Sequence, residues 1–230
     1  MIKDLKQEFP ALRYIFVAGD EVPEETMSIE DMMKNPLEKQ YPQDYLELKK
    51  CPPTEFSVIG VTTGTTGTPK LVEVPVCSWL WSARADNKYL KLAGDDVIAA
   101  LGPAAFGPNM PVYFGGPQVA AKSVFLENWS VKGALGLIEK EKVTVPCVVP
   151  AQLAEMANFP ELDKFNLSSI RVIWCSGAAL PYHVAVEIEE RLKCPVVQSY
   201  GAVDFGGIAH VSIDWPREVR LLTVGLPHPG

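Results

Sequence analysis

The hydrophobic pattern from about residue 94 onward alternates between short apolar runs and amphipathic stretches. A short apolar run is typical of a buried strand, and apolar residues at helical spacing are typical of a helix packed on a sheet. Strands are predicted at 96–101, 121–126, 143–149, 170–175, 196–200, 208–213 and 219–224. Helices are predicted at 131–140, 151–157 and 181–192. This alternation predicts an α/β fold with a layered, mixed or largely parallel sheet and flanking helices.

The beginning of the chain has a weaker pattern. The pattern of residues 1–18 predicts a helix that continues into a strand at 12–18. A short helix is predicted at 28–34. The polar, acidic and proline-rich stretch that follows the strand is typical of a surface connection. We therefore expect two parts, with 1–57 as a partial preceding lobe and connection and 58–230 as the main domain.

Two segments rich in large apolar residues need a separate interpretation. A helix predicted at 77–90 carries Trp79 and Trp81, which we expect to belong to the core. The stretch Val97–Ala121 has no charged residue, but its four prolines and four glycines exclude a membrane-spanning helix. We expect its later part to be a buried loop that forms the wall of a pocket.

Composition narrows the function classes. The chain has 230 residues, 47% of them hydrophobic, and a net charge of −7. Such a charge gives no basic surface for nucleic acid or an anionic membrane, so neither is expected as a partner. The charged N-terminus lacks an apolar signal core, and a cytoplasmic protein without a membrane span is expected.

The cysteines and histidines predict no metal or disulfide framework. Five cysteines form no CxxC pair, and Cys175 and Cys194 in their apolar surroundings are expected to be buried free thiols in a reducing compartment. The three histidines, His183, His210 and His228, are scattered along the sequence. A zinc site is therefore not expected.

A threonine- and glycine-rich stretch is the strongest candidate for chemistry. Thr62-Thr-Gly-Thr-Thr-Gly-Thr-Pro-Lys70 lies between two apolar runs. Hydroxyls, backbone N–H groups freed by glycine, and a terminal lysine form the donor set of a phosphate site. Because Pro69 precedes the lysine and Leu71-Val-Glu-Val follows it, a strand–loop–strand is predicted instead of the strand–loop–helix of a Walker motif.

Three further loops begin where strands are predicted to end. They are Gly102–Asn109, Ser176–Pro181 and Tyr200–Gly207, all rich in small residues. In open α/β sheets, ligands bind beyond the carboxyl ends of the strands. Tyr200 could stack on a ring and Asp204 could hold a divalent cation near phosphates. Taken singly, a Tyr-Gly after a strand is more often an ordinary turn, and an aspartate is more often a helix cap or a solvated side chain.

Together, these motifs resemble the adenylate-forming superfamily of acyl- and aryl-CoA synthetases, luciferases and peptide-synthetase adenylation domains. Thr62–Lys70 is similar to the family's phosphate loop at nearly every position. Ser176–Pro181 is similar to its adenine-contacting turn, Tyr200–Asp204 to its Tyr-Gly-x-Thr-Glu motif, and Val224–Gly230 to a later Val-Gly-x-Pro-x-Pro-Gly segment. The resemblance covers the chain from about residue 50 and is closest to the activators of aryl acids such as dihydroxybenzoate.

The resemblance implies that the chain is part of a large N-terminal domain that binds ATP, Mg²⁺ and a small-molecule carboxylic acid. The acid would form an acyl-adenylate with release of pyrophosphate, and coenzyme A or another thiol would then displace AMP. Lys70 and Thr66 would act in catalysis, Asp204 would hold the metal, and Phe106, Gly201 and Gly206 would border the acid. The nucleotide-binding residues would be Thr62, Thr63, Gly64, Thr65, Thr66, Gly67, Thr68, Lys70, Gly177, Ala178, Ala179, Ser199, Tyr200, Gly201, Ala202 and Val203.

Three departures from the family pattern qualify this interpretation. Val203 and Asp204 replace the family's Thr and Glu, which removes a hydroxyl and shortens the carboxylate's reach. Phe106-Gly107 stands where dihydroxybenzoate activators carry His-Asn, which favours a less polar acid. Family members are usually more than twice as long, so part of an N-terminal lobe and the lysine-bearing C-terminal domain are expected to be absent.

Two alternatives remain open from the sequence. The chain could be a truncated or split nucleotide-binding remnant that does not turn over without a complementary subunit. It could also be a non-enzymatic scaffold in which Thr62–Lys70 is only a polar hairpin.

Overall fold

The computed structural model describes residues 8–35, 37–62, 64, 67–103 and 107–228. The chain divides into two compact units, Met1–Pro52 and Pro53–Gly230.

The described part of the first unit has little regular structure. A parallel pair joins β1 (Phe16–Val17) to β2 (Met27–Ser28), and the helices are α2 (Ile29–Lys34), the 3₁₀ turn η1 (Leu37–Gln40) and α3 (Tyr45–Leu48). The short helix expected at 28–34 is confirmed, with the Ser28 hydroxyl accepting from the Asp31 amide at 3.1 Å. The strand expected at 12–18 is wrong in extent, because only two residues find a pairing partner.

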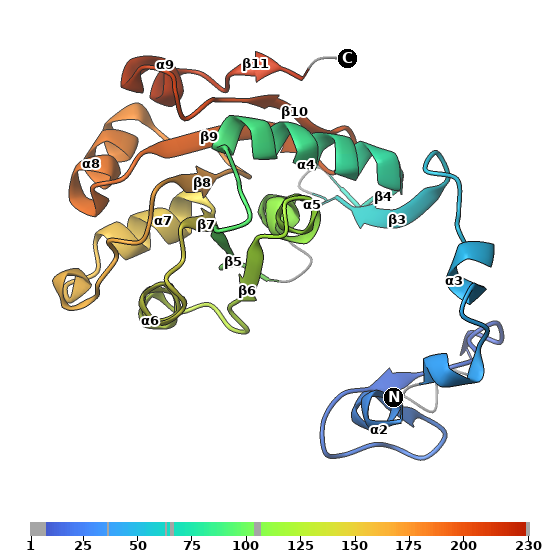
Figure 1. The fold of residues 1–230 in the computed structure, drawn as a ribbon. Coiled ribbons are helices and arrows are strands. Elements are labelled where there is room, and N and C mark those ends of the chain that lie inside the picture. The colour runs from blue at the N-terminus through green and yellow to red at the C-terminus, as the bar shows by residue number, and fades with distance from the viewer. Residues whose placement is uncertain (1–7, 36, 63, 65–66, 104–106, 229–230) are drawn as a thin grey trace. The chain divides into compact units, whose positions relative to one another are not determined.

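The second unit is built on a seven-stranded mixed sheet in the order β11-β10-β9-β8-β7-β5-β6. Five strands run parallel, and β10 and β11 join antiparallel at one edge. The strands are β5 (Val97–Ala100), β6 (Lys122–Phe125), β7 (Val145–Val148), β8 (Ile173–Cys175), β9 (Val196–Ala202), β10 (Gly206–His210) and β11 (Leu226–Pro227). The predicted fold class is confirmed (Figure 1).

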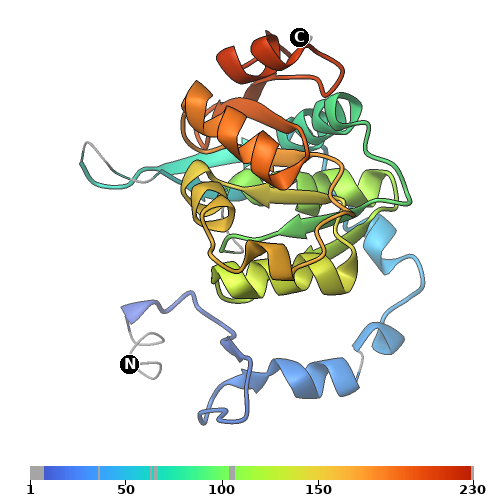
Figure 2. The same cartoon turned by 90° about the vertical axis from the view of Figure 1, so that its left-hand side faces the viewer.

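Helices cover both faces of this sheet, as the continuously apolar strands require. One face packs on α6 (Val131–Glu141), α7 (Pro150–Ala157) and α8 (Tyr182–Leu192), and the other packs on α4 (Val76–Leu90) and on turns that follow β5 (Figures 1 and 2). Strand residues alternate between the faces: Ile173 and Cys175 face the first layer, and Trp174 faces the second. The buried free thiols expected at Cys175 and Cys194 are confirmed, and burial raises the pKa of each to about 12.

A separate antiparallel hairpin precedes the sheet in sequence. It joins β3 (Phe56–Val61) to β4 (Leu71–Pro75) around the threonine- and glycine-rich stretch, so the predicted strand–loop–strand is confirmed. Helix α4 follows immediately and packs on β10. Its buried stripe consists mostly of small and polar residues, which leaves Trp81 50% exposed. The core position expected for Trp81 is therefore wrong.

Two segments adopt structures that the sequence did not predict. Within the uncharged segment, the expected loop contains η2 (Gly107–Asn109), the π-helical turn η3 (Pro111–Gly115) and α5 (Gly116–Gln118). The strand expected at 219–224 is wrong, since this region forms helix α9 (Arg217–Leu222). Helical spacing places Arg217 and Arg220 on one face, where both contact Glu189 of α8. The remaining short turn is η4 (Leu162–Lys164).

Ion pairing ties together the amino ends of three parallel strands. Asp96, before β5, accepts from Arg171 Nε at 2.7 Å and from the hydroxyl of Thr144 at 2.6 Å. Burial alone would raise the pKa of Asp96, but the hydrogen bonds and charge of Arg171, together with those from Thr144 and the Ala93 amide, lower it overall. These contacts hold together the amino-terminal ends of β5, β7 and β8. The loops at the carboxyl-terminal ends of the strands take no part in them and remain available for a ligand.

Candidate functional site

The hairpin turn is held closed by its own backbone and hydroxyl groups. The Thr62 amide donates to the Lys70 carbonyl at 3.0 Å, and the Lys70 amide donates to the Thr62 hydroxyl at 2.9 Å. Gly64 has φ +67°, and a methyl group there would lie 2.7 Å from the Gly67 carbonyl oxygen. The turn therefore requires glycine at this point, and Thr68 and Lys70 remain exposed beside it. Four expected site residues, Thr63, Thr65, Thr66 and Phe106, lie outside the described residues.

The other candidate loops share one edge of the sheet. Because β5, β7, β8 and β9 are parallel, the segments that follow them emerge at the same edge. Gly177, which follows β8, has φ +90°, and a methyl group there would lie 3.2 Å from Pro108 Cγ and 3.3 Å from Val149 Cγ1. The structure thus brings the loop at 176–181 against segments that follow β5 and β7. Gly177, Ala178 and Ala179 are exposed between buried Ser176 and Leu180, which leaves their backbone accessible.

The Tyr200–Asp204 segment links this edge to the hairpin. Strand β9 extends to Ala202, and Val203 and Asp204 lie in the turn to β10. A methyl group added at Gly60 of β3 would lie 2.3 Å from Val203 Cγ1, so the hairpin packs directly on this turn. Tyr200 and Asp204 are exposed, and Ser199 is half-buried. The phosphate-type loop and the carboxylate are therefore brought to one region.

Two glycines form a flat backbone surface beside this turn. A methyl group added at Gly201 would lie 2.4 Å from the Gly206 carbonyl oxygen, which shows how closely the two strands approach. Gly206 itself has φ +72°, a conformation that favours glycine. Gly201 and Ala202 are exposed. The backbone at Gly201 is therefore exposed and carries no side chain of its own.

Sequence reasoning missed the contacts that join these loops. Gly60 meets Val203, and Pro108 and Val149 meet Gly177. A glycine inside a strand often marks a close approach of backbone, which is the signal that could have identified Gly60. Pro108 belongs to the candidate loop at 102–109, but nothing local in the sequence predicts that Pro108 or Val149 contacts Gly177, because these contacts depend on the strand order.

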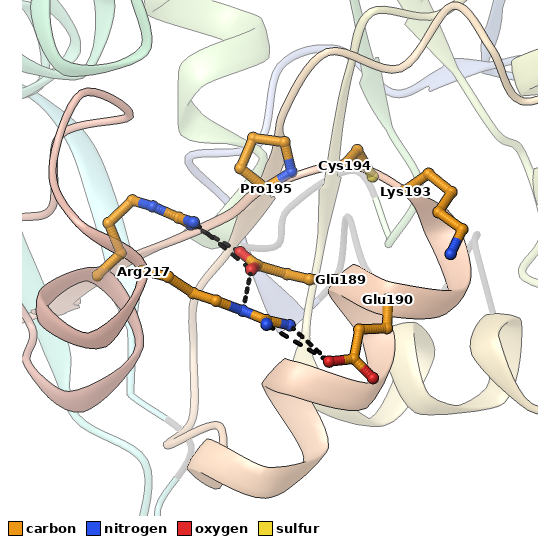
Figure 3. A pocket seen from close by; sticks show the side chains of 7 residues that line it. Glu189, Glu190, Lys193, Cys194, Pro195 and Arg217 are labelled. Atoms are coloured by element: carbon orange, nitrogen blue, oxygen red, sulfur yellow. Dashed lines mark hydrogen bonds and ion pairs between the residues drawn. The ribbon is translucent and has the colours of Figure 1, made fainter.

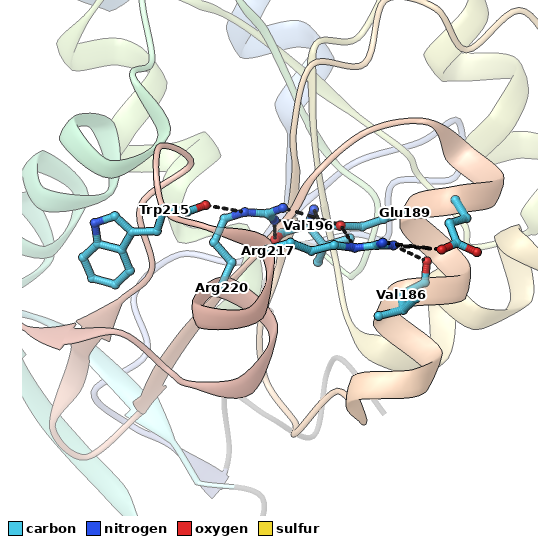
Figure 4. A network of polar contacts seen from close by, with 7 residues as sticks. Val186, Glu189, Val196, Trp215, Arg217 and Arg220 are labelled. Carbon is cyan, nitrogen blue, oxygen red and sulfur yellow. Dashed lines mark hydrogen bonds and ion pairs between the residues drawn. The ribbon is translucent and has the colours of Figure 1, made fainter.

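A hollow of about 420 Å³ lies elsewhere, beside α8 and α9 (Figure 3). Its walls include Glu189, Pro195 and Arg217. Pro195 precedes β9, so the hollow lies at the opposite edge of the sheet from the candidate loops. Its central charges are paired: Arg217 and Arg220 both donate to Glu189, and they also reach the carbonyl oxygens of Val186, Val196 and Trp215 (Figure 4). This network is structural, and the carboxyl edge remains the candidate site.

Comparison with known proteins identifies the family to which this chain belongs. The family model described as "AMP-binding enzyme" matches residues 3–230. The chain belongs to this AMP-binding family. The match covers the hairpin, the three strand-end loops and the sheet that positions them.

Curated relatives are distant in sequence but span nearly the whole chain. A salicyl-AMP ligase / salicyl-S-ArCP synthetase of Mycobacterium tuberculosis is 27% identical over 99% of this chain and 39% of its own length. A 2,3-dihydroxybenzoate-AMP ligase of Bacillus subtilis is 24% identical over 99% of this chain and 40% of its own length. The chain thus spans about two fifths of the length of these relatives.

Solved structures share the fold. An anthranilate CoA ligase, AuaEII, in complex with anthranoyl-AMP superposes with a TM-score of 0.83 at 19% identity, covering 100% of this chain and 43% of that chain. Within the described residues, none of the helices is both long and apolar enough to cross a membrane.

Proposed function

We propose that this AMP-binding chain takes part in the ATP-dependent activation of an aromatic carboxylic acid. The observation that carries the proposal is the packing of the Thr62–Lys70 hairpin on the Val203–Asp204 turn through Gly60. This packing supports a phosphate-binding loop and a carboxylate acting on the same nucleotide. Membership of the family supports ATP as that nucleotide.

In the proposed reaction, a carboxylate oxygen of the acid attacks the α-phosphorus of ATP. A new P–O bond forms, the bond to the β-phosphate oxygen breaks, and the products are an acyl-adenylate and pyrophosphate. The mixed anhydride then has a good leaving group, and the sulfur of coenzyme A or another thiol attacks its carbonyl and releases AMP.

The hairpin would hold the β- and γ-phosphates as charge moves onto pyrophosphate. Donors fixed in advance stabilise developing charge without reorganising during the reaction. The hydrogen bonds between Thr62 and Lys70 hold the base of the turn in place. Lys70 would supply the cation, and Thr66 a hydroxyl at the transferring phosphate.

Adenine would lie along the exposed backbone of Gly177–Ala179, with Tyr200 at its edge. The close contact of Gly177 with Pro108 and Val149 supports a rigid surface at this point. The flat backbone at Gly201 and Gly206 would face the acid together with Phe106. Phe106-Gly107 supplies no side-chain hydrogen-bond donor, which favours an aryl acid less polar than a catechol.

The residues present fit a Mg²⁺ ion next to the phosphates. Magnesium prefers hard oxygen ligands and is commonly bound through one or two carboxylates plus substrate phosphates. Asp204 is an exposed carboxylate in the turn that packs on the hairpin, and it would hold the ion. When bound, Mg²⁺ would neutralise phosphate charge.

Acid-dependent exchange of labelled pyrophosphate into ATP tests the proposed reaction. We expect benzoate, salicylate or anthranilate to support exchange at least tenfold above the rate without acid, and short aliphatic acids to support less. Because the chain spans about two fifths of its relatives' length, Mg·ATP binding is measured in parallel by calorimetry. Binding without exchange would favour a nucleotide-binding protein that needs a further subunit, and the absence of both would contradict the proposal.

A further inference from the structure

Three potential metal ligands from distant parts of the sequence meet inside the second unit. Asp86 lies on α4, His210 ends β10, and His228 follows β11. One ligand atom from each side chain lies within 4.8 Å of the other two. His210 and His228 are far apart in the sequence, but the pairing of β10 with β11 brings their rings together.

The cluster is buried and poorly satisfied by the protein. Asp86 is 3% exposed and His210 is 1% exposed, whereas His228 is half-buried. Nδ1 of His210 lies 2.7 Å from Oδ1 of Asp86, which is close enough for an ion pair. Within the described residues, neither ring nitrogen of His210 or His228 has a hydrogen-bond partner. Buried polar atoms are rarely left this way without a missing ligand, ion or water.

The surrounding structure holds the ligands in place. The His210 ring stacks with Trp174, at a centroid distance of 5.5 Å, and with Tyr89, at 5.8 Å. The His228 amide donates to the Ile208 carbonyl at 2.9 Å. These contacts bring the two imidazole rings to a centroid separation of 4.1 Å.

We propose that Asp86, His210 and His228 form a binding site for a divalent transition metal, with Zn²⁺ the best match. Two imidazoles and one carboxylate are ligands that zinc takes readily, with water in the fourth position. Imidazole nitrogens favour zinc over magnesium or calcium, which prefer oxygen. The half-buried side of His228 gives the ion access to the site.

The bound ion would link α4, β10 and the segment after β11 to one another. A methyl group added at Gly207 would lie 3.4 Å from Nε2 of His210, so the site adjoins the β9–β10 hairpin that carries the Tyr200–Asp204 turn. The inference rests on the cluster alone and does not depend on acid activation.

The test uses zinc chloride with the 230-residue chain in the absence of nucleotide. After dialysis against a weak chelator, elemental analysis is expected to find one zinc ion per chain, and zinc is expected to raise the melting temperature. His228→Ala should weaken zinc binding at least tenfold and abolish that rise, because loss of even an outer-shell partner costs about 10–100-fold in metal affinity. His183→Ala, which removes the exposed histidine on α8, is the matched control and should bind as the wild type does.

Two results of the zinc-binding measurements would overturn the proposal. One is the absence of stoichiometric zinc in the wild-type chain at excess metal, and the other is an equal loss in His183→Ala and His228→Ala. Circular dichroism checks the fold of each variant, and His228→Gln replaces His228→Ala if the latter does not fold. X-ray absorption at the zinc edge of the wild-type chain must show two imidazole ligands, and a spectrum with oxygen ligands alone would also contradict the site.

Discussion

Replacing Glu189 by alanine is expected to destabilise the second unit by about 3–5 kcal/mol, because it leaves a buried arginine without its countercharge. Oε1 of Glu189 accepts from Arg220 Nη1 and from the Val196 amide, both at 2.7 Å. Oε2 accepts from Arg217 Nε at 2.9 Å. The Glu189 side chain therefore links its own helix, α8, to both α9 and β9. Its removal breaks these three hydrogen bonds together.

The neighbouring Glu190 gives a matched control. It contacts the same Arg217 at 3.4 Å, but its side chain is 65% exposed, whereas that of Glu189 is 7% exposed. Exposed ion pairs contribute about 0–1 kcal/mol, so Glu190→Ala should cost no more than that. Urea unfolding followed by tryptophan fluorescence measures both variants, since all five tryptophans lie in the second unit. Equal midpoints for Glu189→Ala and Glu190→Ala would show that the buried network contributes little.

Replacing Lys70 by alanine is expected to weaken Mg·ATP binding about ten- to a hundredfold. A hydrogen bond to a charged group contributes about 1.5–3 kcal/mol, which corresponds to that range of affinity. The effect on AMP should be smaller, because AMP lacks the β- and γ-phosphates that Lys70 is proposed to contact. Isothermal titration of the 230-residue chain with each nucleotide measures both effects.

Lys132→Ala is the control for a general loss of positive charge. Lys132 is exposed on α6, whose residues pack on the sheet away from the hairpin. This variant should bind both nucleotides as the wild type does. A Lys70→Ala chain that binds Mg·ATP with unchanged affinity would remove Lys70 from the site and favour a purely structural hairpin.

Local sequence patterns were sufficient to predict most elements of the sheet and the hairpin. The alternation of apolar runs with amphipathic stretches predicted β5 to β9, and Pro69 together with the run after Lys70 predicted β4. These features depend on periodicity and backbone chemistry, which neighbouring residues determine. The loops after the strands could be proposed as ligand-binding because parallel topology places them at one edge.

The failed expectations depend on contacts between distant residues. The pattern of residues 219–224 predicted a strand, but in the folded chain Arg217 and Arg220 both donate to Glu189 of α8, which requires them on one face of a helix. Trp81 is exposed because the face of α4 that meets the sheet needs small residues: Ser82 Oγ would lie 2.6 Å from a methyl group at Gly207. The local pattern of apolar and polar residues predicts neither the contacts with Glu189 nor the close approach of α4 to Gly207.

The central claim is that the hairpin, the loop at 176–181 and the turn at Asp204 form one nucleotide site. A crystal structure of the 230-residue chain with Mg·ATP tests it most directly. We expect adenine beside Gly177–Ala179 and Tyr200, and the triphosphate along Thr62–Lys70 with the ion at Asp204. Nucleotide bound instead in the hollow beside Glu189 and Arg217, or its triphosphate placed away from the hairpin, would contradict the claim.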